Sequence, residues 1–257
     1  MSSEREQNNH PTRGSLRLAP NVEELEEQKR KVPRQFVNFT FYRALSSWRT
    51  LGESEKQECK RGFISAVDDF RRLMMIHSYS TVGLRTTADF MLWRIGSELD
   101  PMQEMAARLN QTAIAKYVEP THSFLSMTKR SMFIEDGCAD HEEDRNHVVP
   151  GCADYLFLCP LQRTREWYTR PQEQRHEMME ESVRIGSKYR SVRLHTTYSF
   201  GLDDQEFVVA FETDKPADFL DLFQELRETK ASCFTLRDTP MFTCRKRTLA
   251  ECLDAIG

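Results

Sequence analysis

The chain has 257 residues, with 36 Lys and Arg against 40 Asp and Glu, so its formal net charge is −4. This balance argues against a nucleic-acid binder that relies on bulk positive charge, and no apolar run approaches the roughly 18 residues of a membrane span. The first residues show no apolar segment of a secretory signal. Seven cysteines without close spacing fit a reducing compartment, so we expect a cytoplasmic protein.

Residues 1–33 are polar and charged. They carry too little apolar side chain to offset the entropy that ordering would cost. We predict a flexible N-terminal tail, with an arm that clasps a neighbouring subunit as the alternative.

The first half, residues 34–130, shows alternating strand and helix patterns. Apolar residues alternate at 36–42, which predicts a half-buried strand, and a helix is expected to begin at Ser54. The pattern then predicts strands at 73–82 and 89–95, a helix at 100–109 and a strand at 121–127. This β-α-β-β-α-β order is ferredoxin-like. His77 and His122 fall on strands and are interpreted as core or interface residues rather than ligands.

A polar segment without periodicity, residues 131–153, joins the two halves and is long for a connector. It holds four residues of types that bind zinc, namely Cys138, His141, His147 and Cys152. The cysteines do not form the usual close pairs, and the segment is rich in Asp and Glu. A solvated loop is therefore the default interpretation, and a zinc site is the alternative.

The second half, residues 154–257, repeats the order of the first. The pattern predicts a strand at 155–161, a helix at 172–186, strands at 191–200 and 206–212, a helix at 216–229, and strands at 232–236 and 241–244.

Two segments of the chain resemble each other closely. The first runs through Gly83-Leu84 to Asp89-Phe90, and the second runs through Gly201-Leu202 to Glu206-Phe207. Each reads as a strand, a glycine turn, an acidic residue followed by an aromatic one, and an apolar strand. An internal repeat of this kind indicates one module used twice. The expected fold class is α+β, with two ferredoxin-like βαββαβ halves in one compact unit.

The second half also carries a specific set of short motifs. They are Phe157-Leu158-Cys159-Pro160-Leu161-Gln162-Arg163, Glu166-Trp167-Tyr168, Met178-Met179-Glu180-Glu181, Ile185-Gly186 and the run from Tyr198 to Phe207. With these motifs the chain resembles the chlorite dismutase family, which includes the coproheme decarboxylases of haem synthesis. The resemblance covers about residues 34–250 and is strongest over 155–244. It implies a paired ferredoxin-like subunit (a dimeric α+β barrel), assembly into rings that are often pentamers, and a haem held in the C-terminal half.

The resemblance also implies where the haem-site residues fall. Ser182 stands where the family has its proximal histidine, and Leu194 stands at the distal position that is Arg in chlorite dismutases and often Gln in decarboxylases. Cys159 replaces the redox-active tyrosine of the decarboxylases, and Arg163 replaces a lysine. Trp167 is kept.

These departures weaken the case for haem chemistry. A serine hydroxyl is a poor iron ligand compared with imidazole, and a leucine cannot stabilise charge on a leaving oxygen. We therefore do not expect chlorite dismutation. Met178, one helical turn before Ser182, is a candidate substitute ligand, although methionine in a helix is usually core filler. His176 falls on the far side of the helix from Ser182.

The strand phase at the distal position allows two alternatives. Matching Val192 to a valine of the family points Leu194 into the site, whereas a slip by one residue would point Arg193 or His195 inward. We favour the phase that points Leu194 inward.

Two interpretations of the function stay open. In the first, the protein has a haem- or porphyrin-type pocket that ligates haem weakly at most, with either a peroxidase-like or coproheme-related role as a haem-dependent oxidoreductase or a role in transport. In the second, it is a non-catalytic, haem-free binding or scaffold protein. Basic residues at the rim would favour the first interpretation by pairing with propionates, and the candidates are Arg163, Arg184, Lys188 and Arg193. The expected partner is a second copy of the chain, with no nucleic acid and no membrane.

Overall fold

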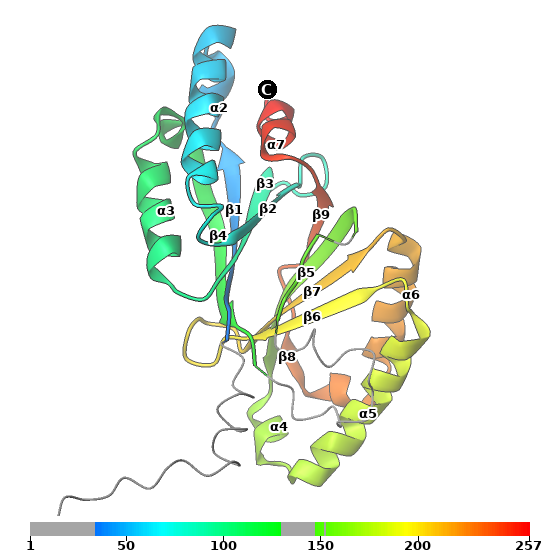
Figure 1. Ribbon diagram of the computed structural model, residues 1–257. Helices are drawn as coiled ribbons and strands as arrows, with labels where there is room; N and C mark the ends of the chain where they lie inside the picture. Colours follow the sequence, from blue (N-terminus) through cyan, green and yellow to red (C-terminus); the bar gives the residue numbers. More distant parts are fainter. Residues whose placement is uncertain (1–33, 130–146, 152) are drawn as a thin grey trace, which may run out of the picture. The chain divides into compact units, whose positions relative to one another are not determined.

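The computed structural model describes residues 34–129, 147–151 and 153–257, and residues 34–257 form one compact unit (Figure 1). The expected N-terminal tail and most of the joining segment lie outside the described residues. The halves proposed at 34–130 and 154–257 are therefore described through their elements, and their exact limits stay a prediction.

The first half forms a four-stranded antiparallel unit with two helices. Its elements are β1 (Phe36–Ala44), α2 (Glu53–Asp68), β2 (Met75–Ser80), β3 (Phe90–Gly96), α3 (Asp100–Asn110) and β4 (Val118–Met127), with the short 3-10 turns η1 (Ser46–Thr50) and η2 (Ala113–Lys116). The strands lie in the order β4-β1-β3-β2. That is the ferredoxin-like order that the sequence predicts.

The second half repeats this arrangement. Its elements are β5 (Tyr155–Arg163), α4 (Arg165–Thr169), α5 (Gln172–Lys188), β6 (Arg193–Tyr198), β7 (Phe207–Thr213), α6 (Pro216–Arg227), η4 (Lys230–Phe234), β8 (Thr235–Arg237) and β9 (Phe242–Lys246). The order β9-β5-β7-β6 matches the order β4-β1-β3-β2 of the first half, and β8 lies beside β5. The α+β fold with two ferredoxin-like halves is thus confirmed.

One predicted strand is wrong in part. Residues 230–234 form the 3-10 turn η4, and strand structure begins only at Thr235. The Thr229 hydroxyl accepts a hydrogen bond from the backbone N–H of Ser232 at 3.3 Å, which caps this turn. A local side-chain hydrogen bond of this kind favours a turn over an extended strand.

The two halves close into one barrel. The nine strands of the described residues form a single sheet, and an additional β7–β5 pairing closes it on itself. The halves meet at two short seams, where Met127 of β4 pairs with Tyr198 of β6, and Tyr79 and Ser80 of β2 pair with Lys246 and Arg245 of β9. Closure pairs both edges of the strands that form the barrel, and only the short β8 keeps a free edge among the described residues.

Apolar residues fill the barrel and both outer layers. The interior is packed with aromatic and aliphatic side chains such as Phe39, Trp93 and Phe242. On one outer face, α2 and α3 cover the sheet of the first half, and a last helix, α7 (Leu249–Ala255), joins them there (Figure 1). On the other, α5 and α6 cover the sheet of the second half. No helix among the described residues is long and apolar enough to cross a membrane.

The sequence repeat is a repeat in the backbone. Gly83 and Gly201 have positive φ values of 76° and 73°, which favour glycine. The carbonyl of Thr81 accepts hydrogen bonds from the backbone N–H groups of Leu84 and Arg85, at 2.9 and 3.0 Å. The carbonyl of Ser199 does the same in the second half, at 2.8 and 3.2 Å. The two turns therefore have the same construction.

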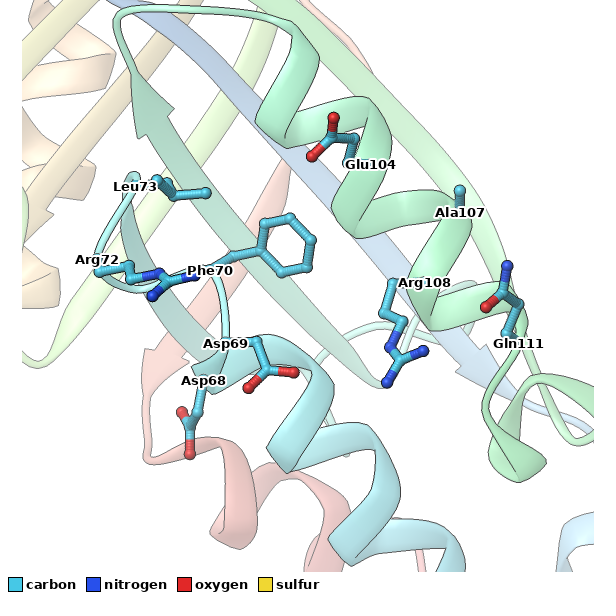
Figure 2. Close-up of a pocket in the computed structure, with 9 residues that line it drawn as sticks. All are labelled: Asp68, Asp69, Phe70, Arg72, Leu73, Glu104, Ala107, Arg108 and Gln111. Carbon is cyan, nitrogen blue, oxygen red and sulfur yellow. The ribbon is translucent and has the colours of Figure 1, made fainter.

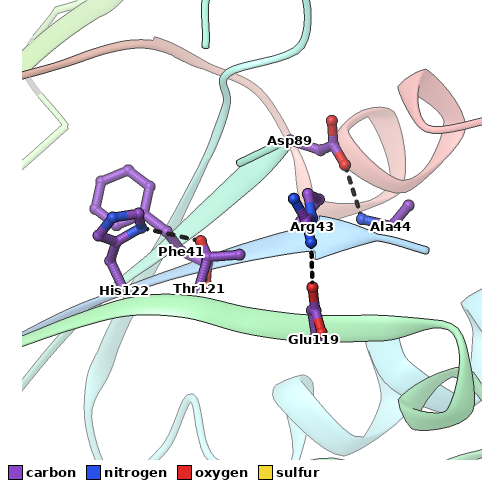
Figure 3. Close-up of polar contacts among 7 residues, drawn as sticks. All are labelled: Phe41, Arg43, Ala44, Asp89, Glu119, Thr121 and His122. Carbon is purple, nitrogen blue, oxygen red and sulfur yellow. Dashed lines mark hydrogen bonds and ion pairs between the residues drawn. The ribbon is translucent and has the colours of Figure 1, made fainter. Parts of the chain in front are cut away.

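The acidic residue of each repeat also has the same task. Asp89 Oδ2 accepts the backbone N–H of Ala44, the last residue of β1, at 2.7 Å (Figure 3). Glu206 Oε2 accepts the backbone N–H of Arg163, the last residue of β5, at 2.7 Å. In both halves a carboxylate thus satisfies the donor at the end of the first strand.

Candidate functional site

The site implied by the resemblance lies where α5 faces the sheet of the second half. On β6, Leu194 pairs with Phe211, and Thr196 pairs with Val209. Both partners belong to the core beneath α5 and α6, so Leu194 lies on the helix side of the sheet. Its side chain is nevertheless 54% exposed. The helix side of β6 therefore presents the exposed side chains of Leu194 and Thr196 and is only partly covered.

The neighbouring histidine points the other way. His195 is buried, and its ring lies 5.6 Å from that of Trp93, which belongs to the barrel interior. Its Nε2 lies 2.9 Å from Glu212 Oε2, also inside the barrel. The His195 imidazole thus packs and hydrogen-bonds inside the barrel and faces away from α5.

Helix α5 is held mainly by polar contacts to its other neighbours. Glu181 Oε2 accepts the backbone N–H of Lys230 in η4 at 3.0 Å, and Lys188 Nζ contacts Glu225 Oε2 of α6 at 2.6 Å. The only buried side chain of α5 is Ile185. These contacts fix the helix against η4 and α6, which is consistent with the incomplete cover over β6.

Ser182 lies on the inner face of α5. It precedes Ile185 by three residues, so the two share a face of the helix, and Ser182 is half-buried. Ile185 packs in the same core as Phe211, the strand partner of Leu194. The structure thus places Ser182 and Leu194 on the helix and on the strand that meet at this core. Met178 is also half-buried, one turn before Ser182.

Cys159 lies deeper in the same core. It is 2% exposed on β5 and pairs with Val209. Burial raises the pKa of its thiol to about 12, so the group stays protonated at neutral pH. A thiol is a much weaker metal ligand and nucleophile than a thiolate. Close by, Phe157 stacks on Phe219 of α6 with ring centroids 3.9 Å apart, which fills the space under α6.

Arg163 and Trp167 form a structural clamp. The guanidinium lies over the Trp167 ring, 5.0 Å from its centroid, and burial lowers the pKa of Arg163. Its Nη1 donates to the carbonyl of Ala231 at 2.5 Å and to Thr235 Oγ1 at 3.1 Å. The Arg163 side chain therefore ties the end of β5 to η4 and β8.

Glu206 is a residue near the site to which the sequence interpretation assigned no role. Its carboxylate accepts from the Tyr168 hydroxyl at 2.5 Å as well as from the backbone of Arg163. Burial, followed by this hydrogen bond and the Glu206 charge, raises the pKa of Tyr168 well above its usual range. The signal was present in the repeat, where an acidic residue precedes the aromatic residue in both halves.

The remaining basic candidates lie on the outer side of α5 or beside it. Lys188 is paired with Glu225, which also accepts from the Tyr189 hydroxyl at 2.6 Å. Arg184 is exposed and lines a surface cavity of about 320 Å³ with Glu177, Glu180, Glu181 and Lys230. Arg193 is half-buried at the start of β6.

Three further histidines of the described residues lie in packed or paired positions. His122 contacts Thr121 at 3.1 Å beside Phe41 (Figure 3), and burial, with a smaller effect of Arg85, lowers its pKa. Burial, followed by the charge of Lys246, also lowers the pKa of His77. On α5, His176 Nε2 lies 3.5 Å from Glu180 Oε1.

Of the zinc candidates, Cys138, His141 and Cys152 lie outside the described residues, so a zinc site at that segment stays untested. His147 is half-buried. Within the part of the chain that the structure describes, no group of three or more His, Cys, Asp or Glu residues is arranged to hold a metal ion.

A second hollow lies in the first half, away from these positions. It has a volume of about 720 Å³ and opens between the end of α2 and α3 (Figure 2). Phe70 and Leu73 supply apolar surface, whereas Asp69 and Arg108 supply opposite charges. Because the lining carries both charges, it favours neither an anionic nor a cationic ligand.

The residues at the implied haem site do not fit a ligated haem iron. The inner face of α5 offers the Ser182 hydroxyl, the Cys159 thiol is protonated and buried, and His195 faces the barrel. None of these supplies the imidazole or thiolate that holds haem iron in proteins. The partly exposed apolar surface at Leu194 does fit the face of a flat apolar ring.

Comparisons with known proteins point to one family. A sequence model described as "Chlorite dismutase" matches residues 56–247. A coproheme decarboxylase of Mycolicibacterium smegmatis is 29% identical over 171 residues, which cover 64% of this chain and 70% of that protein. The structure of a chlorite dismutase from Candidatus Nitrospira defluvii in complex with imidazole has a TM-score of 0.79 at 20% identity, covering 90% of this chain and 98% of the other. This structural likeness shows a shared fold.

Proposed function

Since this chain belongs to the chlorite dismutase family, we propose that it binds a haem-type tetrapyrrole between α5 and the β6–β7 part of the sheet, with weak ligation of iron at most. The observation that carries the proposal is Leu194, whose apolar side chain is 54% exposed on the helix side of β6. Apolar surface left open beside a packed core favours an apolar ligand.

The role proposed for the bound group is coproheme- or haem-related, in the manner of a peroxidase-like oxidoreductase. Chlorite dismutation is not proposed, because Leu194 offers no cation or hydrogen-bond donor for a developing oxyanion. We also propose that the protein works as a cytoplasmic homo-oligomer, with a ring of five subunits as the favoured form.

Haemin titration followed by the Soret band near 400 nm tests the proposal. The unmodified protein is expected to bind haemin weakly and without a histidine-ligated spectrum. Ser182→His is expected to tighten haemin binding at least tenfold, because the inner face of α5 then carries an imidazole. Ser187→His is the matched control, since Ser187 is exposed on the same helix. A histidine-ligated spectrum in the unmodified protein would contradict the weak-ligation claim.

A haem-free binding or scaffold protein is the second candidate. It is favoured by the Phe157–Phe219 stack, which fills part of the space under α6, and by Arg163, whose guanidinium is bound to η4 and β8. If neither the unmodified protein nor Ser182→His binds haemin, the site is closed and this second function holds.

A further inference from the structure

The apolar site beside α5 has surfaces suited to the faces of a porphyrin but no imidazole or thiolate suited to its metal. Leu194 presents methyl groups from β6, and the inner face of α5 presents Ser182 next to Ile185. Neither surface offers an imidazole or thiolate ligand. A porphyrin ring would gain the same apolar contacts with or without iron, because this stabilisation depends on the apolar area buried.

Iron would make binding less favourable at such a site. Ferric haem carries a positive charge at its centre, and moving a charge from water to an apolar surface without a partner is costly. The nearest candidate donors do not offset this cost: burial keeps the Cys159 thiol protonated, and His195 is hydrogen-bonded to Glu212 inside the barrel. The centre of a metal-free porphyrin is neutral and needs no axial ligand.

The cations near the site do not separate the two ligands. Arg190 is exposed just beyond the end of α5, whereas Arg193 shares the barrel face of β6 with His195 and points away from Leu194. Basic residues here would attract peripheral carboxylates. Metal-free protoporphyrin IX and haemin carry the same two propionates, so this attraction contributes equally to both. The ratio of their dissociation constants therefore reports on the metal centre alone.

We infer that the site selects metal-free porphyrin carboxylates over their iron complexes. This inference rests on the proposed tetrapyrrole binding; it narrows the ligand to porphyrins without iron, and a carrier or storage role then takes the place of the peroxidase-like role. The position held by Ser182 determines the selection, and the apolar face at Leu194 determines the affinity for the ring. The chain then acts on porphyrin before iron insertion, or after iron removal, as a carrier or a store.

Equilibrium dialysis of the full chain against protoporphyrin IX and, separately, against haemin tests the inference. We expect the unmodified protein to bind protoporphyrin IX at least tenfold more tightly than haemin. Ser182→His is expected to invert this order by strengthening haemin binding while protoporphyrin binding changes less than threefold. Ser187→His should change neither affinity.

The ring contact is tested by a second pair of variants. Leu194→Glu places a charge on the exposed apolar face of β6 and is expected to weaken binding of protoporphyrin IX at least tenfold. Leu220→Glu is the control, because Leu220 is 62% exposed on α6, and it should leave binding unchanged. Both positions are exposed, so neither charge has to be buried on folding.

The outcomes separate this inference from the proposed function. If the unmodified protein binds both porphyrins with affinities within threefold, or haemin more tightly, the preference for metal-free porphyrin is wrong while the tetrapyrrole function stands. If it binds neither, the tetrapyrrole function itself is wrong. If Leu194→Glu and Leu220→Glu weaken binding equally, the ligand lies elsewhere and the inference falls.

Discussion

Glu212 is a buried charge that connects three parts of the molecule. It is 1% exposed in the barrel, and its carboxylate accepts from Gly151 N at 2.7 Å and contacts His195 Nε2 at 2.9 Å. The Tyr79 hydroxyl donates to it at 3.3 Å. Burial by itself would raise the pKa of Glu212, but the hydrogen bonds from His195, Gly151 and Tyr79 hold the pKa below its ordinary value.

This arrangement predicts an acid-sensitive contribution to stability. A carboxyl whose folded pKa is depressed stabilises the fold at pH values above its unfolded pKa, about 4.3, and the contribution is lost as pH falls through the folded pKa. Glu212→Gln should therefore lower the free energy of unfolding by about 2–3 kcal/mol at pH 7, and the difference should shrink as pH falls towards 3. Urea unfolding at several pH values measures it.

Glu228→Gln is the control for this prediction. Glu228 is exposed just after α6, so its replacement should change the unfolding free energy by less than about 0.5 kcal/mol at every pH. A Glu212→Gln cost that stays constant from pH 7 to pH 3 would show that its carboxylate charge does not stabilise the barrel.

At the scale of elements, glycine has opposite effects in the turns and in the helices. Gly201 has φ +73° and Gly62 lies in the exposed middle of α2, and a Cβ at either position meets no atom within 4 Å. Gly201→Ala should thus cost about 1–2 kcal/mol from backbone strain alone. Gly62→Ala should instead add about 0.5–1 kcal/mol, because alanine loses less entropy in a helix.

Thermal unfolding of the two variants measures this contrast. The melting temperature should fall for Gly201→Ala and rise for Gly62→Ala. Gly83→Ala should behave like Gly201→Ala, since the two turns have the same backbone construction. A neutral result at both turns would mean that they adopt other conformations in solution.

The sequence predicted the elements that depend on local pattern. Alternation and helical spacing placed the strands and helices of both halves, and the glycine–acid repeat indicated that the halves are equivalent. The sequence pattern did not predict η4, where the Thr229 cap outweighs the strand pattern, and it did not predict helix α7. For α7 the signal was available, because Thr248 and Glu251 form a capping box at its start.

The site was predictable only as far as positions along single elements. The resemblance placed Ser182 on a helix and Leu194 on a strand, and alternation decided which face Leu194 takes. The hydrogen bonds of the Arg163 side chain were not predictable, because its partners Ala231 and Thr235 are far away in sequence. Likewise, only the folded barrel brings His195 to Glu212 and away from α5.

For the whole molecule, the proposed ring leads to a prediction about mass. Several large apolar side chains stay exposed in the isolated chain, among them Leu84 at 52% and Leu236 at 67%. Single exposed residues are normal in a monomer, so the expectation rests on the family together with these surfaces. Light scattering should give about five times the chain mass of 30.2 kDa. A monomer at micromolar concentration would contradict it.

Helix α7 connects late residues of the chain to the first half. Leu249, Cys252 and Leu253 are buried in the core that α2 and α3 share with the sheet of that half, and Asp254 pairs with Lys60 of α2 at 3.1 Å. During synthesis on the ribosome, the first half therefore emerges early but lacks part of its core until residues 249–255 leave the exit tunnel. The apolar face of the first half that α7 covers in the folded protein therefore stays exposed while the second half is translated. Nascent chains stalled before residue 249 should consequently engage chaperones through their earliest-made segment.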